Sequence, residues 1–515
     1  MQRKKLPIGI QTFREIREEG YYYVDKTPLA LKLFTEGKYY FLSRPRRFGK
    51  SLFLDTLAEL FEANRPLFAG LYAEDHWDWS IRYPVIRLSF AGGRMEHREQ
   101  LDARIVDLLR INQQNLGLDC PPHLDIPGCF GELIRAAQRK HGQRVVVLVD
   151  EYDKPILDNL TSPELARAMR EGLRNLYSVI KDQDAHIKFA FLTGVSKFSK
   201  VSLFSGLNNL RDITVSNDYS ALCGYTETDV DSVFAPELEG LDRQQIRDWY
   251  NGYNWTGESV YNPFDLLLLF REREFRNYWF ETGTPTFLID VLTQRGEWLP
   301  DLEQREATED LLSAFDVGDM ATEALMFQAG YLTISRTENL GGALFYILGY
   351  PNREVREALT GGLLRAWSPD GQATVRNRMR LYRRLEANDF AGLRDLFQAH
   401  FASIPHDWYR NNPIAQYEGY WASVFYAYFA ALGLDIRLED TTNQGRLDMT
   451  LLFNGQVYLF EFKVVELTPK GRALEQLKAK RYADKYRALG QPIHLIGIEF
   501  SKDERNLLGF EVERG

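Results

Sequence analysis

The sequence predicts an α/β protein built from several domains, and three observations support this prediction. The chain has 515 residues, more than one hydrophobic core normally organises, so several domains are expected. Short, uninterrupted apolar runs alternate with stretches of helical spacing through residues 39–195. Near the C-terminus, two alternating apolar runs flank an Asn-Gly pair, which is the strongest short-range signal for a β-hairpin.

The composition is that of an ordinary soluble globular protein, with 44% hydrophobic and 26% charged residues. No apolar run is long enough to cross a bilayer, and the basic start of the chain lacks the apolar stretch of a secretory signal. The cysteines Cys120, Cys129 and Cys223 have no nearby histidine partners, so neither a zinc site nor a disulfide framework is indicated. We therefore expect a protein of the reducing cytoplasm that has no membrane partner.

The net charge of −9 argues against a protein whose whole surface is adapted to nucleic acid. Any contact with nucleic acid would therefore need a local basic patch. Residues 470–487 are one candidate, because their seven lysines and arginines outnumber the acids Glu475 and Asp484 by five charges.

Four apolar runs form the strands of the predicted first sheet, at residues 39–43, 84–90, 145–151 and 189–195. Uninterrupted apolar strands that alternate with helices indicate a parallel sheet covered on both faces. The segment SRPRRFGKS, residues 43–51, joins the first of these strands to the first long helix. A turn from a strand into a helix directs free backbone N–H groups towards an anion.

The end of this turn has the residues that bind a nucleotide phosphate. Gly49 lets the backbone approach the phosphate, Lys50 reaches the β- and γ-phosphate oxygens, and the Ser51 hydroxyl can ligate Mg²⁺. Arg44 stands where the usual pattern has a glycine, so Pro45 and the arginines must shape the opening of the turn differently. A basic turn that ends in Gly-Lys-Ser by chance is the alternative interpretation.

Two further strand ends support a nucleotide site. Asp150 and Glu151 end an apolar run, where an aspartate can hold Mg²⁺ through water and the next carboxylate can polarise the attacking water. Thr193 ends the following strand, where a polar side chain can sense the γ-phosphate. Solvated acids at a strand end and a core threonine are the alternatives. Because two independent elements coincide, the sequence favours a nucleotide site.

Five segments of the chain together resemble one protein family. They are RPRRFGKS (44–51), VLVDEYDKP (147–155), LTGVSKFSKVSLFSGLNNL (192–210), CGYTETDV (223–230) and WYNGYNW (249–255). The sequence is similar to the AAA-ATPase-like P-loop proteins of bacteria and archaea, which often carry a C-terminal PD-(D/E)XK nuclease-like domain.

The resemblance implies an AAA-like parallel-sheet ATPase core that binds ATP and is followed by a helical lid. It makes Arg47, Phe48, Gly49, Lys50, Ser51, Asp150 and Thr193 the candidate nucleotide-binding residues, with Ser51 and Asp150 near Mg²⁺ and Glu151 as the catalytic carboxylate. An arginine at the position of Arg44 is typical of these relatives.

The middle of the chain is predicted to support the sites. In WYNGYNW, turn-forming residues separate aromatic anchors, so a packing role is favoured over a ligand site. Residues 325–350 read as helix, strand, Gly-Gly turn and strand, which resembles a winged-helix hairpin, and an arginine-rich helical connector follows at 352–400. The predicted domains are a P-loop ATPase core (1–215), a helical lid (216–300), a winged-helix-like part with a helical connector (301–400) and a restriction-endonuclease-like α/β domain (401–515).

The register of the C-terminal hairpin, residues 446–465, can be worked out from its turn. If Asn454-Gly455 is a two-residue loop, Phe453 pairs with Gln456 and Asp448 lies directly across from Glu461. Side chains repeat with period two, so Lys463 emerges on the same face as Glu461. The predicted buried face consists of Leu447, Met449, Leu451, Phe460 and Phe462.

Two carboxylates placed opposite each other repel, and a divalent cation is the natural compensating charge. Asp448, Glu461 and the Phe462 carbonyl would then ligate Mg²⁺ or Mn²⁺, and Lys463 would orient or deprotonate the water that attacks a phosphodiester. This arrangement is the PD-(D/E)XK signature, and it predicts a nuclease-type fold.

Two predicted helices complete this domain. A helix over residues 470–489 has Leu474, Leu477, Tyr482, Tyr486 and Leu489 on one face. Nucleases of this superfamily often carry a glutamine or lysine there near the scissile phosphate, which makes Gln476 the candidate, although a solvated face is the alternative for Lys480. Glu418, early in the helix 417–433, matches a carboxylate that some relatives direct at the metal, and a buried structural glutamate is an equal possibility.

These observations predict an ATP-regulated, metal-dependent nuclease that acts on nucleic acid, with DNA favoured and a homo-oligomer possible. The alternative is an ATP-dependent switch or binding protein whose nuclease-like domain recognises nucleic acid or a partner without cleaving it. A nuclease with a vestigial ATPase is a third interpretation, and Asp150 and Glu151 argue against it.

Overall fold

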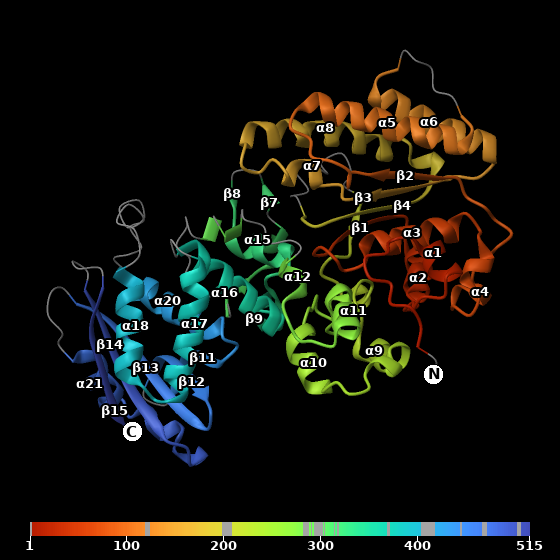
Figure 1. Cartoon of the computed structure of the whole chain (residues 1–515). Helices are drawn as coiled ribbons and strands as arrows, with labels where there is room; N and C mark the ends of the chain where they lie inside the picture. Colours follow the sequence, from red (N-terminus) through yellow and green to blue (C-terminus); the bar gives the residue numbers. More distant parts are fainter. Residues whose placement is uncertain are drawn as a thin grey trace. The chain divides into compact units, whose positions relative to one another are not determined.

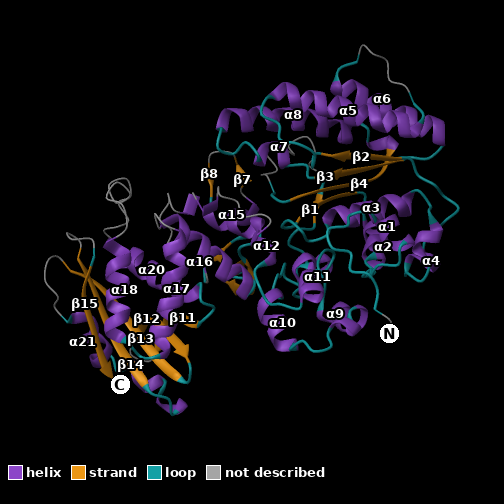
Figure 2. Cartoon of the chain, in the orientation of Figure 1, coloured by secondary structure: helices purple, strands orange, loops and turns teal. Residues whose placement is uncertain are grey.

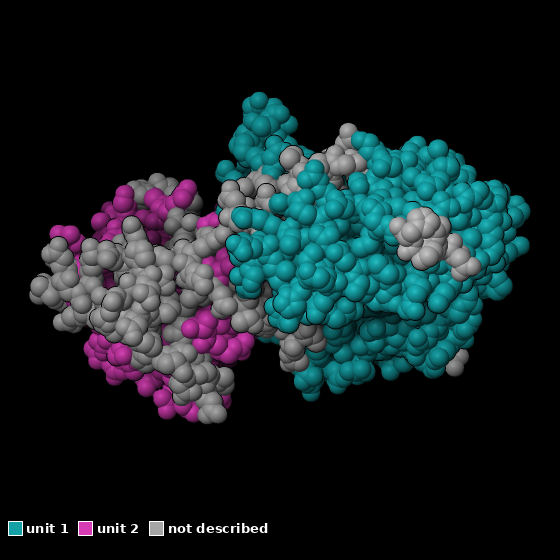
Figure 3. Space-filling view, turned by 90° about the horizontal axis from the view of Figure 1, so that it is seen from above, with its two compact units in different colours: residues 1–283, 306–352 teal, residues 284–305, 353–515 magenta. Residues whose placement is uncertain are grey.

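The computed structural model divides into two compact units, residues 1–283 with 306–352 and residues 284–305 with 353–515, which Figure 3 colours separately. It describes the chain apart from residues 1–2, 119–123, 198–208, 282–287, 290, 293–301, 303, 314, 317–318, 368–370, 403–417, 443–444, 466–470 and 502–505. The predicted division into four domains stays a prediction.

The first unit contains a five-stranded sheet in the order β2-β3-β4-β1-β5, and its paired strands run parallel. Its strands are β1 (Tyr39–Ser43), β2 (Val85–Ser89), β3 (Val145–Asp150), β4 (Ile187–Gly194) and β5 (Arg211–Asp212). The four predicted strands and their parallel direction are confirmed. The short edge strand β5 was not predicted, because two residues are too few to give a periodic signal.

Helices cover both faces of this sheet, as Figures 1 and 2 show, with α5, α6 and α8 on one face and α1, α2 and α3 on the other. The helices are α1 (Phe13–Glu18), α2 (Thr27–Glu36), α3 (Lys50–Phe61), α4 (Ala73–His76), α5 (Arg98–Leu116), α6 (Ile126–His141), α7 (Lys154–Leu157) and α8 (Pro163–Asp182). Local signals set their ends. In α6, for example, the Asp125 side chain accepts a hydrogen bond from the Gly128 amide, and Gly142 ends the helix with φ 69°.

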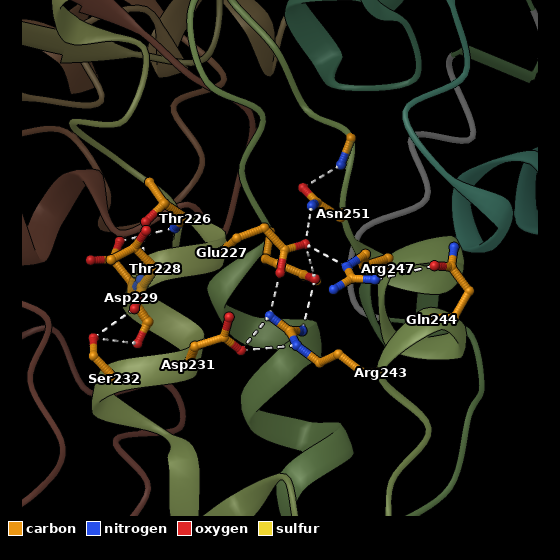
Figure 4. A network of polar contacts seen from close by, with 12 residues as sticks. Thr226, Glu227, Thr228, Asp229, Asp231, Ser232, Arg243, Gln244, Arg247 and Asn251 are labelled. Atoms are coloured by element: carbon orange, nitrogen blue, oxygen red, sulfur yellow. Dashed lines mark hydrogen bonds and ion pairs between the residues drawn. The ribbon is translucent and has the colours of Figure 1, made fainter.

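The predicted lid region is helical. It contains α9 (Glu227–Val233), α10 (Arg243–Tyr250), α11 (Pro263–Glu272) and α12 (Tyr278–Glu281). The aromatic side chains of residues 249–255 are buried, so their predicted packing role is confirmed. Figure 4 shows how a polar network around Glu227 ties α9 to α10. The Glu227 carboxylate accepts hydrogen bonds from Arg243, Arg247 (3.2 Å), Asn251 (2.9 Å) and Tyr261 (2.7 Å).

The remainder of the first unit has the predicted order of helix, strand, Gly-Gly turn and strand. Its elements are β6 (Glu306–Ala307), α14 (Glu309–Ser313), β7 (Phe315–Asp316), β8 (Asp319–Met320), α15 (Thr322–Ala329), β9 (Thr333–Leu340) and β10 (Ala343–Gly349). Strands β9 and β10 form an antiparallel hairpin that turns at Gly341 and Gly342, both with positive φ. The likeness to a winged helix stays a prediction.

The second unit has a mixed five-stranded sheet in the order β11-β12-β13-β14-β15, in which β13 and β14 are parallel and the other pairs are antiparallel. Its strands are β11 (Asp435–Thr442), β12 (Gly445–Phe453), β13 (Gln456–Val465), β14 (Ile493–Ser501) and β15 (Leu507–Arg514). Its helices are α16 (Arg353–Trp367), α17 (Gly371–Glu386), α18 (Phe390–Ala402), α20 (Glu418–Ala430) and α21 (Arg472–Ala479). Among the helices that the structure describes, none has the length and hydropathy of a membrane span.

The prediction of one helix over residues 470–489 was wrong. Helix α21 ends at Ala479, Arg481 takes a left-handed conformation with φ 49°, and two 3₁₀ turns follow. This break turns Tyr482 and Tyr486 into the cluster that Leu477 also joins, while Leu489 is left 51% exposed. The left-handed backbone of Arg481 costs free energy that a continuous helix would not cost. Burial of the two tyrosines compensates for this cost.

Candidate functional site

The loop between β1 and α3 is held by its own lysine. Lys50 is buried, and its Nζ donates to the carbonyl oxygens of Arg44 and Pro45, each at 2.9 Å. Gly49, with φ 88°, immediately precedes α3, so the helix begins at the end of the loop. Burial lowers the pKa of Lys50, and the charge of Asp150 acts in the opposite direction.

Arg44 shapes the opening of the loop by packing inwards. Its side chain is 1% exposed and donates to the carbonyls of Ser43 (2.9 Å), Thr214 (2.8 Å) and Tyr219 (3.2 Å). The guanidinium also lies 3.9 Å from the centre of a Trp255 ring, and burial lowers its pKa to about 10. An arginine in place of the usual glycine thus anchors the loop to residues far along the chain.

The next residues of the loop face different surroundings. Arg47 is exposed and lies 4.3 Å from the centre of the Phe264 ring. Phe48 is buried and packs edge-on against Tyr253 and Trp255, with ring centres 4.6 Å and 5.6 Å away. The aromatic segment 249–255 therefore packs against the loop through Phe48.

Asp150 is the last residue of β3, and Glu151 follows it. Strand β4 lies between β3 and β1 in the sheet. Glu151 is in a left-handed conformation with φ 49°, an uncommon state for a residue with a side chain, and its amide donates to Asp150 Oδ1 at 3.0 Å. Burial and the charge of Asp150 raise the pKa of Glu151, while Lys50 lowers it. A carboxyl group in such surroundings is suited to take a proton from water.

Two neighbouring side chains have structural partners. Asp153 is buried and accepts hydrogen bonds from the amides of Val195 (3.1 Å) and Ser196 (2.6 Å), so it fastens the end of β3 to the end of β4. Sequence reasoning missed it, although it lies two residues after Glu151. Thr193 is fully buried and donates to the Leu42 carbonyl at 2.9 Å, which is the behaviour of a core threonine. Its phosphate-sensing role stays a prediction that this hydrogen bond does not support.

A cavity of about 340 Å³ opens on this loop. Its walls include loop residues 46–51, Glu151, residues 222–225 and Pro263, Phe264 and Leu267 of the predicted lid. Two N-terminal stretches close it, Pro7 with residues 9–11 and residues 22–24 with Lys26. Sequence reasoning missed these stretches, because nothing in their local pattern distinguishes a cavity wall from a loop.

In the second unit the predicted hairpin register is confirmed. Asn454 and Gly455 have φ 50° and 71°, as a two-residue hairpin turn requires, and pairing runs from Phe453–Gln456 to Met449–Phe460. Sequence reasoning expected the next pair to set Asp448 directly across from Glu461. The described pairing ends one step earlier, and Asp448 Oδ2 instead accepts the Phe462 amide at 2.8 Å.

The side of β12 that Leu447 faces differs from the prediction. The other four residues of the predicted buried face are buried, and so is Leu447. Leu447, however, belongs to the cluster of Leu459, Leu477 and Tyr482, which lies on the side of Glu461. The regular alternation fails here because β12 no longer follows β13 beyond Met449.

Glu461 is the centre of a polar cluster. It is 1% exposed, and its Oε1 accepts from Lys463 Nζ at 3.1 Å and from the side-chain amide of Gln476 on α21. Gly497 of β14 pairs with Glu461 and allows the close approach of α21, because a Cβ there would lie 2.4 Å from the Leu474 nitrogen. Packing thus brings three sequence-predicted residues together.

Tyr482 belongs to the same cluster and was predicted only as a packing residue. Its hydroxyl donates to the Arg446 carbonyl at 2.7 Å. Burial raises the pKa of Tyr482, and the charges of Glu461 and Asp448 raise it further while Lys463 lowers it. These effects place its hydroxyl within electrostatic reach of both carboxylates. Tyr486 lies on the same predicted helix face, so the sequence pattern alone could not distinguish the role of Tyr482 from that of Tyr486.

The structure brings few candidate metal ligands together among the residues that it describes. Within the part of the chain that the structure describes, no group of three or more His, Cys, Asp or Glu side chains is placed to hold a metal ion. The Glu418 side chain lies outside the described residues, so its role stays a prediction. Asp448 and Glu461 are the described carboxylates of the predicted set, and oxygen ligands of this kind suit Mg²⁺ or Mn²⁺.

Comparison with known proteins agrees with both parts of this description. A family profile described as predicted AAA-ATPase matches residues 7–204, and one described as PD-(D/E)XK nuclease superfamily matches residues 416–509. The chain belongs to the AAA-ATPase-like family. The resemblance that its motifs indicated is therefore confirmed, together with the nuclease-superfamily domain at the C-terminus of this AAA-ATPase-like protein.

One relative covers the whole length of this AAA-ATPase-like chain. It is described as an uncharacterized protein in the vnfD 5′ region of Azotobacter chroococcum mcd 1. It is 68% identical over 514 residues, which is 100% of this chain and 99% of the relative. No solved structure matches the chain.

Proposed function

We propose that the protein binds and hydrolyses ATP with Mg²⁺, and that its C-terminal domain is a metal-dependent phosphodiesterase acting on nucleic acid. The contact of Glu461 with both Lys463 and Gln476 is the observation that carries the phosphodiesterase. The cavity that Lys50, Ser51 and Glu151 line together supports the ATPase.

In the nucleotide site, the backbone around Gly49 would cradle the phosphates and Lys50 would exchange its carbonyl partners for phosphate oxygens. The Ser51 hydroxyl and Asp150 would hold Mg²⁺, Asp150 through water. Glu151 would accept a proton from the attacking water, a task that its raised pKa favours. Arg47 and Phe48 line the same cavity and would contact the nucleotide.

In the nuclease-like site, a divalent ion would neutralise phosphate charge and lower the pKa of bound water. Asp448 and Glu461 would hold it, and two carboxylates are enough because Mg²⁺ commonly keeps several waters and a substrate phosphate oxygen. Lys463 would orient the attacking water, and Gln476 would donate to the scissile phosphate or to Glu461. At the C-terminal end of α21, the helix that carries Gln476, Lys480 and Arg481 are exposed, which suits a polyanionic substrate such as DNA.

One observation favours a second candidate function, a domain that binds nucleic acid without cleaving it. Glu461 Oε1 already accepts two hydrogen bonds, and no third ligand from His, Cys, Asp or Glu accompanies the pair within the described residues. A site with this composition would recognise nucleic acid while holding metal weakly.

Cleavage of labelled DNA and RNA by the full chain, with Mg²⁺ or Mn²⁺ and with or without ATP, tests the proposal. Lys463→Ala is expected to abolish cleavage. The matched control is Arg394→Ala, because Arg394 is an exposed basic residue of the same unit that pairs with Asp395 and lies outside the basic patch of residues 470–487. Retained nucleic-acid binding with no cleavage under any condition would favour the second function.

A further inference from the structure

The loop before α3 carries three arginines, and the structure gives them different surroundings. Arg44 is buried against backbone carbonyls, and Arg47 lies over the Phe264 ring. Arg46 is exposed and lines the cavity together with Lys50 and Glu151. Its guanidinium makes no ion pair or hydrogen bond with other residues in the described part of the chain. It is thus a cation in the cavity wall that the fold does not use.

The backbone that carries Arg46 is nevertheless held firmly. The Trp279 indole donates to the Arg46 carbonyl at 3.3 Å, and Lys50 donates to the carbonyl of Pro45 at 2.9 Å. Gly330 at the end of α15 packs so closely that a Cβ on it would lie 2.7 Å from Pro45. A surface arginine on a loose turn would need none of these contacts, so the position of Arg46 is defined by the fold.

Arg46 also shares the cavity wall with Glu151, the proposed catalytic carboxylate, and with Lys50. Arg46 and Lys50 therefore bring positive charge to the region of the cavity where Glu151 would deprotonate water. Negative charge on the transferring phosphoryl group develops in the same place during ATP hydrolysis.

We propose that Arg46 is a further catalytic residue that contacts the γ-phosphoryl group of ATP during transfer, so that the chain carries its own arginine finger. The inference rests on the proposed ATPase function. Water oxygen forms the new bond to the γ-phosphorus, the bond to the β–γ bridging oxygen breaks, and Glu151 takes the proton of the water. Arg46 donates to the oxygens that gain charge, and ADP and phosphate leave. Many P-loop enzymes receive this arginine from another molecule, whereas a residue of the loop acts within one chain.

The test compares Arg46→Ala and Arg46→Lys with the wild-type chain by ATP binding, single-turnover hydrolysis and trapping of ADP with aluminium fluoride. We expect Arg46→Ala to lower the hydrolysis rate by about 10³-fold, to abolish fluoride trapping and to change the Kd for ATP little, because the contact forms in the transition state. Arg46→Lys should recover part of the rate. Arg139→Ala is the matched control, because Arg139 is an exposed arginine near the C-terminal end of α6 that pairs with Glu132 and does not line the cavity.

A rate per chain that is independent of protein concentration supports an arginine supplied within the chain. A rate that rises with chain concentration, or an Arg46→Ala chain that hydrolyses ATP and traps ADP like the wild type, overturns the inference alone. A wild-type chain that hydrolyses no ATP overturns the proposed ATPase and the inference with it. Equal losses of ATP binding and of rate would show that Arg46 binds the ground state, which also contradicts the proposed role.

Discussion

Replacing Tyr482 with phenylalanine removes one hydroxyl from the carboxylate cluster and leaves the aromatic packing in place. The hydroxyl donates to the Arg446 carbonyl at 2.7 Å, two residues before Asp448. β12 still pairs with β11 here, with Arg446 opposite Thr441, but it has parted from β13, so this bond and the one from the Phe462 amide to Asp448 position Asp448 on the side of Glu461. Arg446 is an exposed residue, so the loss is that of an ordinary hydrogen bond, about 0.5–1.5 kcal/mol. If about 1 kcal/mol of that is lost from the metal-bound state, the Kd for Mn²⁺ rises about fivefold.

Tyr486→Phe is the matched control for this prediction. Tyr486 is equally buried in the same cluster, but its hydroxyl donates to the Asp440 carboxylate of β11. A hydrogen bond to a charged group is worth about 1.5–3 kcal/mol, so this variant should lose at least as much stability as Tyr482→Phe. Mn²⁺ titration calorimetry and urea unfolding of the full chains separate the two effects. Equal Mn²⁺ affinity in the two variants would refute a positioning role for Tyr482.

Other predictions concern both sites. Glu151→Gln should bind ATP normally and hydrolyse it about 10²-fold more slowly, as measured by nucleotide titration and phosphate release, and unchanged turnover would contradict its role as base. Burial raises the pKa of Glu151, and a base must be unprotonated to act. The hydrolysis rate should therefore fall on acidification at a higher pH than an exposed glutamate would give. A rate that stays constant down to the pKa of an ordinary glutamate would contradict this prediction. Arg44→Ala should lower the free energy of unfolding by about 3 kcal/mol, because three buried carbonyls lose their donor. Arg46 is exposed on the same loop, so Arg46→Ala should change the free energy of unfolding by less than about 0.5 kcal/mol. Equal values for the two variants in urea unfolding would refute this prediction. Lys463→Ala should keep Mn²⁺ binding in calorimetry while cleavage is lost, and a parallel loss of metal binding would make Lys463 structural.

The features that depend on neighbouring residues could be predicted from the sequence. The parallel strands follow from uninterrupted apolar runs between helices, and β3 is indeed buried along its whole length. The register of β12 and β13 follows from Asn454 and Gly455, which accept the positive φ that a two-residue turn requires. The loop before α3 and the two carboxylates of the hairpin were recognisable because their chemistry lies within a few residues of a strand end.

Tertiary structure decided what these residues contact. Arg44 is buried because Thr214, Tyr219 and Trp255, more than 150 residues away in sequence, pack around it. The walls of the cavity and the break after α21 likewise depend on packing between distant segments. The pKa of Glu151 is set by burial and by nearby charges, including that of Arg46, and both arise only when such segments meet. Periodicity and turn chemistry are local properties of the chain, whereas burial is a property of the assembled core. For that reason the sequence alone could name candidate residues and propose roles for them, but not what each of them contacts.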